Sequence, residues 1–496
     1  MARRVARPML RFLHIEAASG ILLIAATVVA MVWANSPVSN SYNDLWTTEV
    51  VVSVGDFITL ESHEEGGEEA GGEEAGGHEE GGEEGAAEAS GEEAAGETAG
   101  AGEGTDAAEE GEEEEGEEEA HGLTLREVVN DALMTVFFFV VGMEIKMELV
   151  RGQLRDRRAA ALPAMAALGG MVVPALIYVA LNVGGQVDGW GIPMATDIAF
   201  AVGVVSLLGP RVPASMKVFL LTLAIVDDIG AILVIALFYT ESLSMGWLAV
   251  AVGLVVLMIV MQRVRIWYIP LYVVVGMAIW FAAFQSGVHA TIAGVVMGLI
   301  TPAVALRAAP VEETWTGLVL HDDELGASKV RRAQFEIRET VPVAERLIDV
   351  LHPFTSFVII PIFALANAGI ELSNETLSAA AESPVTWGVF LGLVVGKLVG
   401  VTLFTWLATV LRISSLPPGV NFGHISGIAA VAGIGFTVSI FITGLAFSDL
   451  ATQDESKIGI LAASIVAALV GLLILSRSSR DRRVRIEEAL EQSADF

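Results

Sequence analysis

The sequence contains no cysteine among its 496 residues. This absence excludes disulfide bonds and thiolate metal sites, although it does not identify the compartment of the protein. No water-facing segment carries side chains suited to catalysis, so we expect neither an enzyme nor a cofactor. The glycine-rich stretch EEGGEEAGG lacks the lysine and the strand–helix context of a phosphate loop. A net charge of −32 also argues against binding of nucleic acid.

Lysine and arginine are missing from one block of the chain. Residues 61–120 hold 26 acidic residues and no basic one, and without this block the net charge is only about −6. Its GGEE repeats predict a disordered, solvated insert over 61–122. The favoured interpretation is a repulsive loop suited to a salty exterior. Cation binding, helped by His63, His78 and His121, stays open as the alternative.

The rest of the chain is poor in charge and rich in long apolar runs. Hydrophobic residues make up 53% of the sequence and the mean hydropathy is +0.62, which favours an all-α polytopic membrane protein. We predict about twelve transmembrane helices. They cover residues 16–35, 127–148, 159–182, 189–209, 215–239, 245–262, 267–285, 288–302, 352–371, 385–411, 424–447 and 457–476.

Basic residues predict the orientation in a bacterial inner membrane. They cluster at both ends of the chain and in the loops after the second, fourth, sixth and eighth spans, whereas the loops between these are poor in them. Both termini, 1–15 and 477–496, are therefore expected in the cytoplasm, which requires an even number of spans. The first span, within 16–44, resembles a signal peptide, but its cleavage would break this even count.

Two further segments lie outside the predicted spans. Residues 45–60 alternate with β-branched side chains around a Gly-Asp pair, which predicts a periplasmic hairpin. Residues 303–351, between the spans of 123–302 and those of 352–476, form a charged and partly amphipathic loop. We expect this loop on the cytoplasmic surface of the membrane.

Two adjacent carboxylates stand in the middle of the apolar run LLTLAIVDDIGAILVIALF. An aspartate at the centre of a spanning helix costs about 2.5–3.5 kcal/mol on insertion scales, so the presence of both Asp227 and Asp228 in this segment requires an explanation. One interpretation is a structural pair with a buried base. The favoured one is a cation or proton site, which is the default for carboxylates inside a membrane.

Few other ionisable groups interrupt the spans, and these are the candidate partners. They are Asp131, Glu144, Glu148, Asp197 beside Thr196, His289 and Lys397. Lys397 would neutralise one carboxylate of the pair, and the other would remain to bind a cation or a proton.

Spans 4 and 11 carry helix-breaking residues at matching places, Pro193 in one and Gly433 with Gly435 in the other. Spans 3–5 and 10–12 then form two triplets of opposite topology, each with a broken middle helix. This pattern indicates an inverted-repeat transporter whose site lies in mid-membrane beside the breaks. Asp197 is placed to offset exposed N–H groups there, and Lys397 to offset exposed carbonyl ends.

Several long motifs, in order, resemble the NhaA-type bacterial Na⁺/H⁺ antiporters. They are NDALMTVFFFVVGMEIKMEL, ATDIAF, LAIVDDIGAI, SGVHATIAGV, FALANAGI, GKLVG and AGIGFTVSIF. The resemblance covers the chain apart from 61–121 and part of 303–340. It implies secondary active export of Na⁺ or Li⁺ in exchange for protons, for sodium and pH homeostasis.

The resemblance also implies roles for single residues. Asp227 and Asp228 match the paired ion-binding aspartates, and Lys397 matches the lysine that pairs with Asp227. Thr196 and Asp197 match the crossing of the broken helices. Asp131 matches an aspartate near the ion path, the group Glu144, Glu148 and His289 matches positions tied to pH response, and 45–60 matches a dimerisation element. The stretch ERLIDVLHP departs from the family, because Ile348 stands at a position where the family's pH-sensing segment carries a glutamate.

The expected mechanism is competition at a desolvated carboxylate pair, which holds either protons or a small hard cation with Thr196. Moving more than one proton per cation would make the exchange electrogenic. Two other functions stay open. One is a Na⁺-coupled organic anion symporter of similar fold, which would need more basic groups than Lys397. The other is a non-transporting membrane sensor.

Overall fold

The computed structural model describes residues 2–50, 123–240, 243–264, 266, 268–305, 340–417 and 419–494. Helices dominate this part of the chain, and the expectation of an all-α polytopic membrane protein is confirmed. Seven helical segments are long and apolar enough to cross a membrane. They are Leu125–Arg151, Arg157–Leu181, Ala214–Phe238, Met245–Arg263, Val343–Asn367, Pro384–Val410 and Leu450–Ser478.

Three further candidate spans are helix pairs that bend sharply at a short break. The pairs are Ala18–Ala34 with Ser39–Trp46, Val187–Met194 with Ile198–Leu207, and Phe422–Ala432 with Phe436–Ala446, bent by 114°, 41° and 47°. Two shorter apolar helices, Ile269–Phe284 and Ala290–Ile300, occupy the places predicted for the seventh and eighth spans. Each predicted span therefore has a helical counterpart in the described part of the chain.

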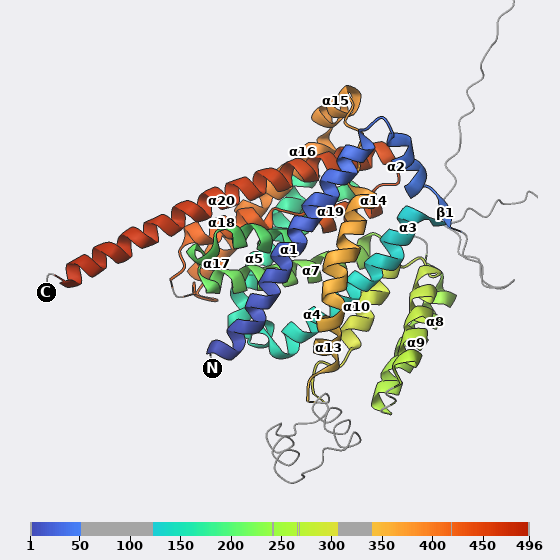
Figure 1. The fold of residues 1–496 in the computed structure, drawn as a ribbon, viewed down its shortest axis with the longest axis horizontal. Coiled ribbons are helices and arrows are strands. Elements are labelled where there is room, and N and C mark those ends of the chain that lie inside the picture. The colour runs from blue at the N-terminus through green and yellow to red at the C-terminus, as the bar shows by residue number, and fades with distance from the viewer. Residues whose placement is uncertain are drawn as a thin grey trace, which may run out of the picture. The chain divides into compact units, whose positions relative to one another are not determined.

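The elements of the first half, labelled as in Figure 1, are mostly α-helices, with one π-helical segment, three 3₁₀ helices and two short strands among the described residues. They are α1 (Ala2–Ala34), α2 (Ser39–Trp46), β1 (Glu49–Val50), β2 (Leu123–Thr124), α3 (Leu125–Val128), η2 (Val129–Leu133), α4 (Met134–Arg151), η3 (Gln153–Arg155), α5 (Arg157–Leu181), η4 (Val187–Met194), α6 (Ile198–Leu207), η5 (Gly209–Arg211) and α7 (Ala214–Phe238).

The second half continues in the same manner, and the last helix runs far past its apolar stretch (Figure 1). Its elements are α8 (Met245–Arg263), α9 (Ile269–Phe284), α10 (Ala290–Ile300), α13 (Val343–Phe354), η6 (Thr355–Ile359), α14 (Ile360–Asn367), α15 (Asn374–Glu382), α16 (Pro384–Leu391), η7 (Gly392–Gly396), α17 (Lys397–Val410), α18 (Phe422–Ala432), α19 (Phe436–Ala446) and α20 (Leu450–Ala494).

Side-chain caps fix where two of the spans begin. The Thr124 hydroxyl accepts the Glu127 N–H while the Glu127 carboxylate accepts the Thr124 N–H, a capping box that starts the second span. Asp449 lies just before α20 and accepts the hydroxyl and the N–H of Thr452. These hydrogen bonds favour the ionised form and lower the pKa of Asp449 below its usual value.

Three sequence predictions need correction at element boundaries. Within the predicted hairpin 45–60, Leu45 and Trp46 end α2, and β1 pairs with β2; residues 51–60 lie outside the described residues. The predicted loop 303–351 is helical from Val343. The sequence indicated a loop there because the first turns of α13 carry polar side chains on one face. The predicted tail 477–496 continues α20 as far as Ala494.

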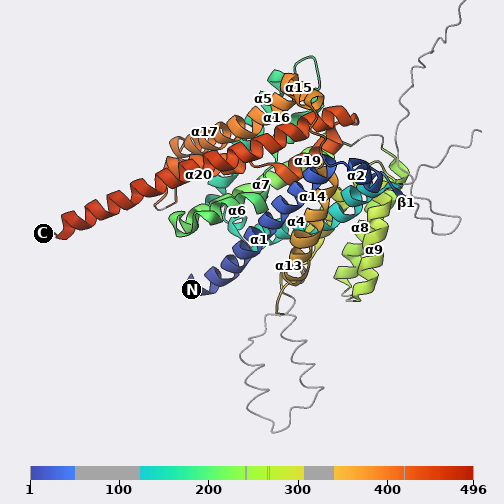
Figure 2. The same cartoon turned by 45° about the horizontal axis from the view of Figure 1, so that its top comes forward.

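The two predicted triplets of spans have the same order of elements. Each has a helix, a broken pair and a further helix: α5, η4–α6 and α7 in the first, and α16–α17, α18–α19 and α20 in the second. Across the breaks, η4 packs on α19 while α6 packs on α18, so the broken helices cross. The helices α5 and α17 pack along each other, and α18 packs against both α17 and α20 (Figure 1); Figure 2 shows α17 and α20 from a second direction.

A cluster of aromatic rings joins other helices to this crossing. Phe441 on α19 packs against Phe138 on α4, with ring centroids 5.3 Å apart, and against Phe363 on α14 at 6.4 Å. All three side chains are buried. Aromatic side chains bury large apolar areas, so this cluster fixes α19 against α4 and α14.

Candidate functional site

The breaks in the two crossing helices have local causes. In the first, the 3₁₀ helix η4 ends at Met194, one residue after Pro193, whose ring removes a backbone donor. Extended backbone at Ala195 then leads to Asp197, the N-cap of α6. In the second, a Cβ at Gly433 would lie 2.3 Å from the Leu393 carbonyl oxygen, so only glycine fits this close approach.

Asp197 holds the two breaks together. Its Oδ1 accepts the Phe200 N–H at 3.0 Å, and its Oδ2 accepts the N–H of Thr437 at 3.1 Å as well as the Thr437 hydroxyl. The Asp197 N–H donates to the Ile434 carbonyl at 2.7 Å. One buried carboxylate thus caps the N-termini of both α6 and α19, where the helix dipoles concentrate positive charge.

Removing this shared cap is expected to destabilise the crossing. Asp197→Ala leaves buried N–H groups of two helices without an acceptor, at about 1–3 kcal/mol for each such group. The thermal unfolding midpoint of the purified protein in detergent should therefore fall clearly. Asp197→Asn keeps one accepting oxygen and should lose less. Equal midpoints for the alanine variant and the wild type would contradict the shared cap.

Asp227 on α7 is fully buried and engages its partners through one oxygen. Its Oδ2 accepts the Lys397 ammonium at 2.7 Å and lies 2.8 Å from the Thr196 hydroxyl. Lys397 also donates to the Thr196 oxygen, at 3.0 Å. That hydroxyl has a second acceptor, the Ala432 carbonyl at 2.9 Å, and its single hydrogen serves one acceptor at a time.

These contacts bring four elements to one place. Thr196 comes from the first break, Asp227 from α7, Lys397 from the start of α17, and the Ala432 carbonyl from the end of α18. Lys397 is as completely buried as Asp227, and its ammonium contacts a carboxylate and a hydroxyl.

Asp228 is buried next to this pair and is differently placed. Within the described part of the chain it makes neither a hydrogen bond nor an ion pair, while 8% of its surface is exposed. The site therefore combines one neutralised carboxylate with one that has no direct counter-ion among the described residues.

Asp131, Glu148 and His289, which the sequence analysis also singled out, make their contacts away from Asp227, Thr196 and Lys397. Asp131 lies in the π-helical turn η2, where its carbonyl accepts the Trp280 indole N–H at 3.4 Å. Glu148, on the last turn of α4, accepts the Gln153 N–H at 2.6 Å. His289 contacts the Tyr239 carbonyl, just past the end of α7.

Two site residues escaped the sequence analysis. Thr437 donates a hydrogen bond to Asp197. The sequence feature that could have indicated this contact is a hydroxyl side chain at the second position of the helix that follows Gly435. His352 lies 3.7 Å from Glu144, and this side chain was passed over within the motif VLHP. Both contacts join residues more than two hundred positions apart, which no local pattern displays.

The oxygen atoms at the crossing define what the site can bind. Among the described residues, no three His, Asp or Glu side chains gather as a metal cluster would require. The oxygen atoms present are the carboxylates of Asp227 and Asp228, the Thr196 hydroxyl and the Ala432 carbonyl, and such oxygens suit a small hard cation or protons.

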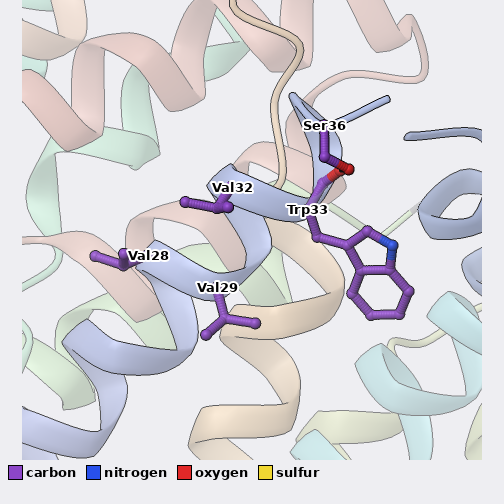
Figure 3. Close-up of a pocket in the computed structure, with 5 residues that line it drawn as sticks. All are labelled: Val28, Val29, Val32, Trp33 and Ser36. Carbon is purple, nitrogen blue, oxygen red and sulfur yellow. The ribbon is translucent and has the colours of Figure 1, made fainter. Parts of the chain in front are cut away.

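A surface depression on α1 has the opposite character. It has a volume of about 360 Å³ and is lined by Val28, Val29, Val32, Trp33 and Ser36, as Figure 3 shows. More than half of the surface of each valine is exposed, and no lining residue is ionisable. An apolar outer face of this kind suits contact with lipid rather than ion binding.

Comparison with known proteins gives one consistent result. The model of the family Na⁺/H⁺ antiporter 1 matches residues 10–65 and 111–475, so the unmatched stretch between them falls within the acidic insert. The chain is 40% identical over 473 residues to Na⁺/H⁺ antiporter NhaA 3 of Frankia alni, covering 95% of this chain and 89% of that protein. It is 40% identical to Na⁺/H⁺ antiporter NhaA of Oleidesulfovibrio alaskensis, covering 96% and 95%, and 41% identical to that of Rhodopirellula baltica, covering 95% and 93%.

Proposed function

Because the chain belongs to the Na⁺/H⁺ antiporter 1 family, it is a membrane transporter that exchanges Na⁺ for protons, and we propose that the exchange takes place at Asp227 and Asp228. One observation carries this assignment. Asp227 is neutralised by Lys397 through a single oxygen, while Asp228 beside it has no direct counter-ion among the described residues. Such a pair is costly to leave bare and needs a cation or a proton.

Competition for the pair couples the two ions. When Na⁺ or Li⁺ binds, the carboxylates of Asp227 and Asp228 and the Thr196 hydroxyl replace part of its hydration shell. When the cation leaves, protons neutralise the same oxygens. The exchange is electrogenic if more than one proton moves for each cation, and the membrane potential then drives it.

The crossing of the broken helices supplies the conformational element. Helices α6 and α19 start at a shared cap, Asp197, and their partner halves η4 and α18 pack across the breaks. A unit tied in this way can tilt against its neighbours and open the site to one face at a time. Asp197 balances helix-end charge during this motion, and Lys397 keeps Asp227 compensated.

The remaining predicted residues complete the proposal. Asp131 lies on the ion path, and Glu144, with its neighbour His352, belongs with Glu148 and His289 to the pH response. The protein is a multi-pass protein of the bacterial inner membrane with both termini in the cytoplasm, as its basic ends indicate. A homodimer formed through residues 45–60 rests on the resemblance of that segment to the family.

Everted membrane vesicles test the function directly. Addition of Na⁺ or Li⁺ to acid-loaded vesicles should release protons with no organic solute present, and this result distinguishes an antiporter from a symporter of organic anions. Asp227→Asn loses the charge that holds both Lys397 and the cation, so its exchange should be lost. Normal exchange by this variant, at wild-type amounts in the membrane, would refute the assignment of the site.

A further inference from the structure

The two oxygens of the Asp227 carboxylate have different surroundings. Oδ2 receives the hydrogen bonds from Lys397 and Thr196, whereas Oδ1 is buried and has no hydrogen-bond partner among the described residues. The whole side chain is inaccessible from outside, with 0% of its surface exposed. Most buried acceptors have a donor, so an oxygen without one points to a ligand.

The residue that faces Oδ1 is Gly170, in the middle of α5. A Cβ atom added there would lie 3.8 Å from Asp227 Oδ1 and 3.6 Å from Lys397 Cδ, both ordinary contact distances. The same atom would lie 2.9 Å from Val401 Cγ2, which is too close without movement. Any side chain at position 170 would therefore cover the free oxygen of the carboxylate.

Backbone conformation does not account for this glycine, and its close contact with Val401 involves the end of a side chain rather than backbone. Gly170 lies inside a continuous helix and is not among the glycines with positive φ, so other residues can adopt its backbone angles. Glycine is disfavoured within a helix relative to alanine. Its neighbour Gly169 is different, because a Cβ there would lie 2.3 Å from the Gly400 carbonyl oxygen and would force α5 and α17 apart.

We propose that Gly170 is a specificity-determining residue of the antiporter. By presenting no side chain, it leaves Asp227 Oδ1 open to the transported cation and to a water that the cation keeps. This inference rests on the proposed role of Asp227 in binding the cation. A methyl group at position 170 replaces that water by an apolar contact and lowers the number of ligands. Na⁺, which is larger than Li⁺ and needs more ligands, loses more by this change.

The test uses variants in which the packing effect is separated from the effect on the oxygen. Gly170→Ala is combined with Val401→Ala, since the smaller side chain removes the close contact at 2.9 Å. Exchange is measured in everted vesicles over a range of Na⁺ and Li⁺ concentrations. Relative to Val401→Ala alone, the double variant should raise KM for Na⁺ by about tenfold or more, with a smaller rise for Li⁺ and a kcat close to that of the single variant.

A serine at position 170 provides a matched control. Gly170→Ser with Val401→Ala adds nearly the same volume as alanine but supplies a hydroxyl oxygen, so its KM for Na⁺ should lie between those of the single and the alanine double variants. Purified protein titrated with Na⁺ and with Li⁺ should give the same order of affinities without transport.

Three outcomes would overturn the inference. The first is a double variant whose KM values match those of Val401→Ala, because a methyl group at position 170 would then not affect cation binding once its close contact with Val401 is removed. The second is an equal rise of KM for both cations, which removes the role in specificity. The third is serine no better than alanine. By contrast, a wild type and a Val401→Ala variant that both release no protons would refute the antiport function itself.

Discussion

Asp228→Asn is expected to abolish the release of protons that Na⁺ or Li⁺ causes in everted vesicles, while the protein still folds and inserts. Among the described residues Asp228 makes no hydrogen bond or ion pair, so the loss of its charge breaks no structural contact. The same loss removes an anionic ligand from a cation in a medium of low dielectric constant, where each charge matters most. We expect exchange to fall by at least about a hundredfold, which corresponds to two ordinary tenfold steps of about 1.4 kcal/mol each.

The measurement needs two controls. The thermal unfolding midpoint of Asp228→Asn in detergent should equal or exceed that of the wild type, because an uncompensated buried charge has been removed. Asp188→Asn changes an aspartate at the start of η4, several residues before the break. Its backbone carbonyl, and not its side chain, accepts the Tyr239 hydroxyl, so this variant should exchange normally. If Asp228→Asn exchanges Na⁺ at the wild-type rate and KM, Asp228 is not a ligand.

Lys397→Met is expected to produce a large loss of stability. It removes the ammonium group that neutralises Asp227, and both side chains are fully buried, with the ammonium nitrogen 2.7 Å from the carboxylate oxygen. Removing one partner of a buried ion pair typically costs about 3–5 kcal/mol, because the other charge stays buried and uncompensated. The loss should shrink as the pH falls, since a protonated Asp227 carries no charge that needs compensation.

The double variant Lys397→Met with Asp227→Asn separates stability from transport. Replacing both members of a buried pair by neutral groups of similar size is often neutral or stabilising, so its unfolding midpoint should return close to the wild-type value. The Thr196 hydroxyl can still donate to the amide oxygen of the introduced asparagine, which takes the place of Asp227 Oδ2. Exchange should stay absent, because the anionic ligand is gone. A double variant as unstable as Lys397→Met would mean that Lys397 acts through contacts other than the ion pair.

Local features of the sequence were sufficient to locate the spans and the charged residues that stand within them, although Thr437 and His352 were missed. The apolar runs marked the membrane segments because hydropathy is a property of a short window. Asp227, Asp228, Asp197 and Lys397 were noticeable because these charges stand in otherwise apolar runs. The breaks at Pro193 and Gly433 were visible for a similar reason, since both residue types act on the backbone beside them.

Predictions about where elements begin and end were less successful. The alternation of 45–60 indicated strands from Leu45 onward, but Leu45 and Trp46 end the helix α2, and β1 pairs with β2, more than seventy residues later. The polar face of residues 343–351 suggested a loop, although these residues form the first turns of a helix that packs on α4. The first half of span 4 is a 3₁₀ helix rather than an α-helix, and nothing local distinguished the two.

The many membrane spans and the carboxylate pair in mid-span follow from residues that are neighbours in the chain, so both could be predicted without coordinates. Which atoms contact one another is known only from the folded protein. Lys397 reaches Asp227 across 170 positions and Thr196 across 201. It takes one carboxylate oxygen and leaves the other to face Gly170. Packing at the crossing of the broken helices places these side chains. Because packing joins segments that are far apart in the chain, no local sequence pattern shows the contact.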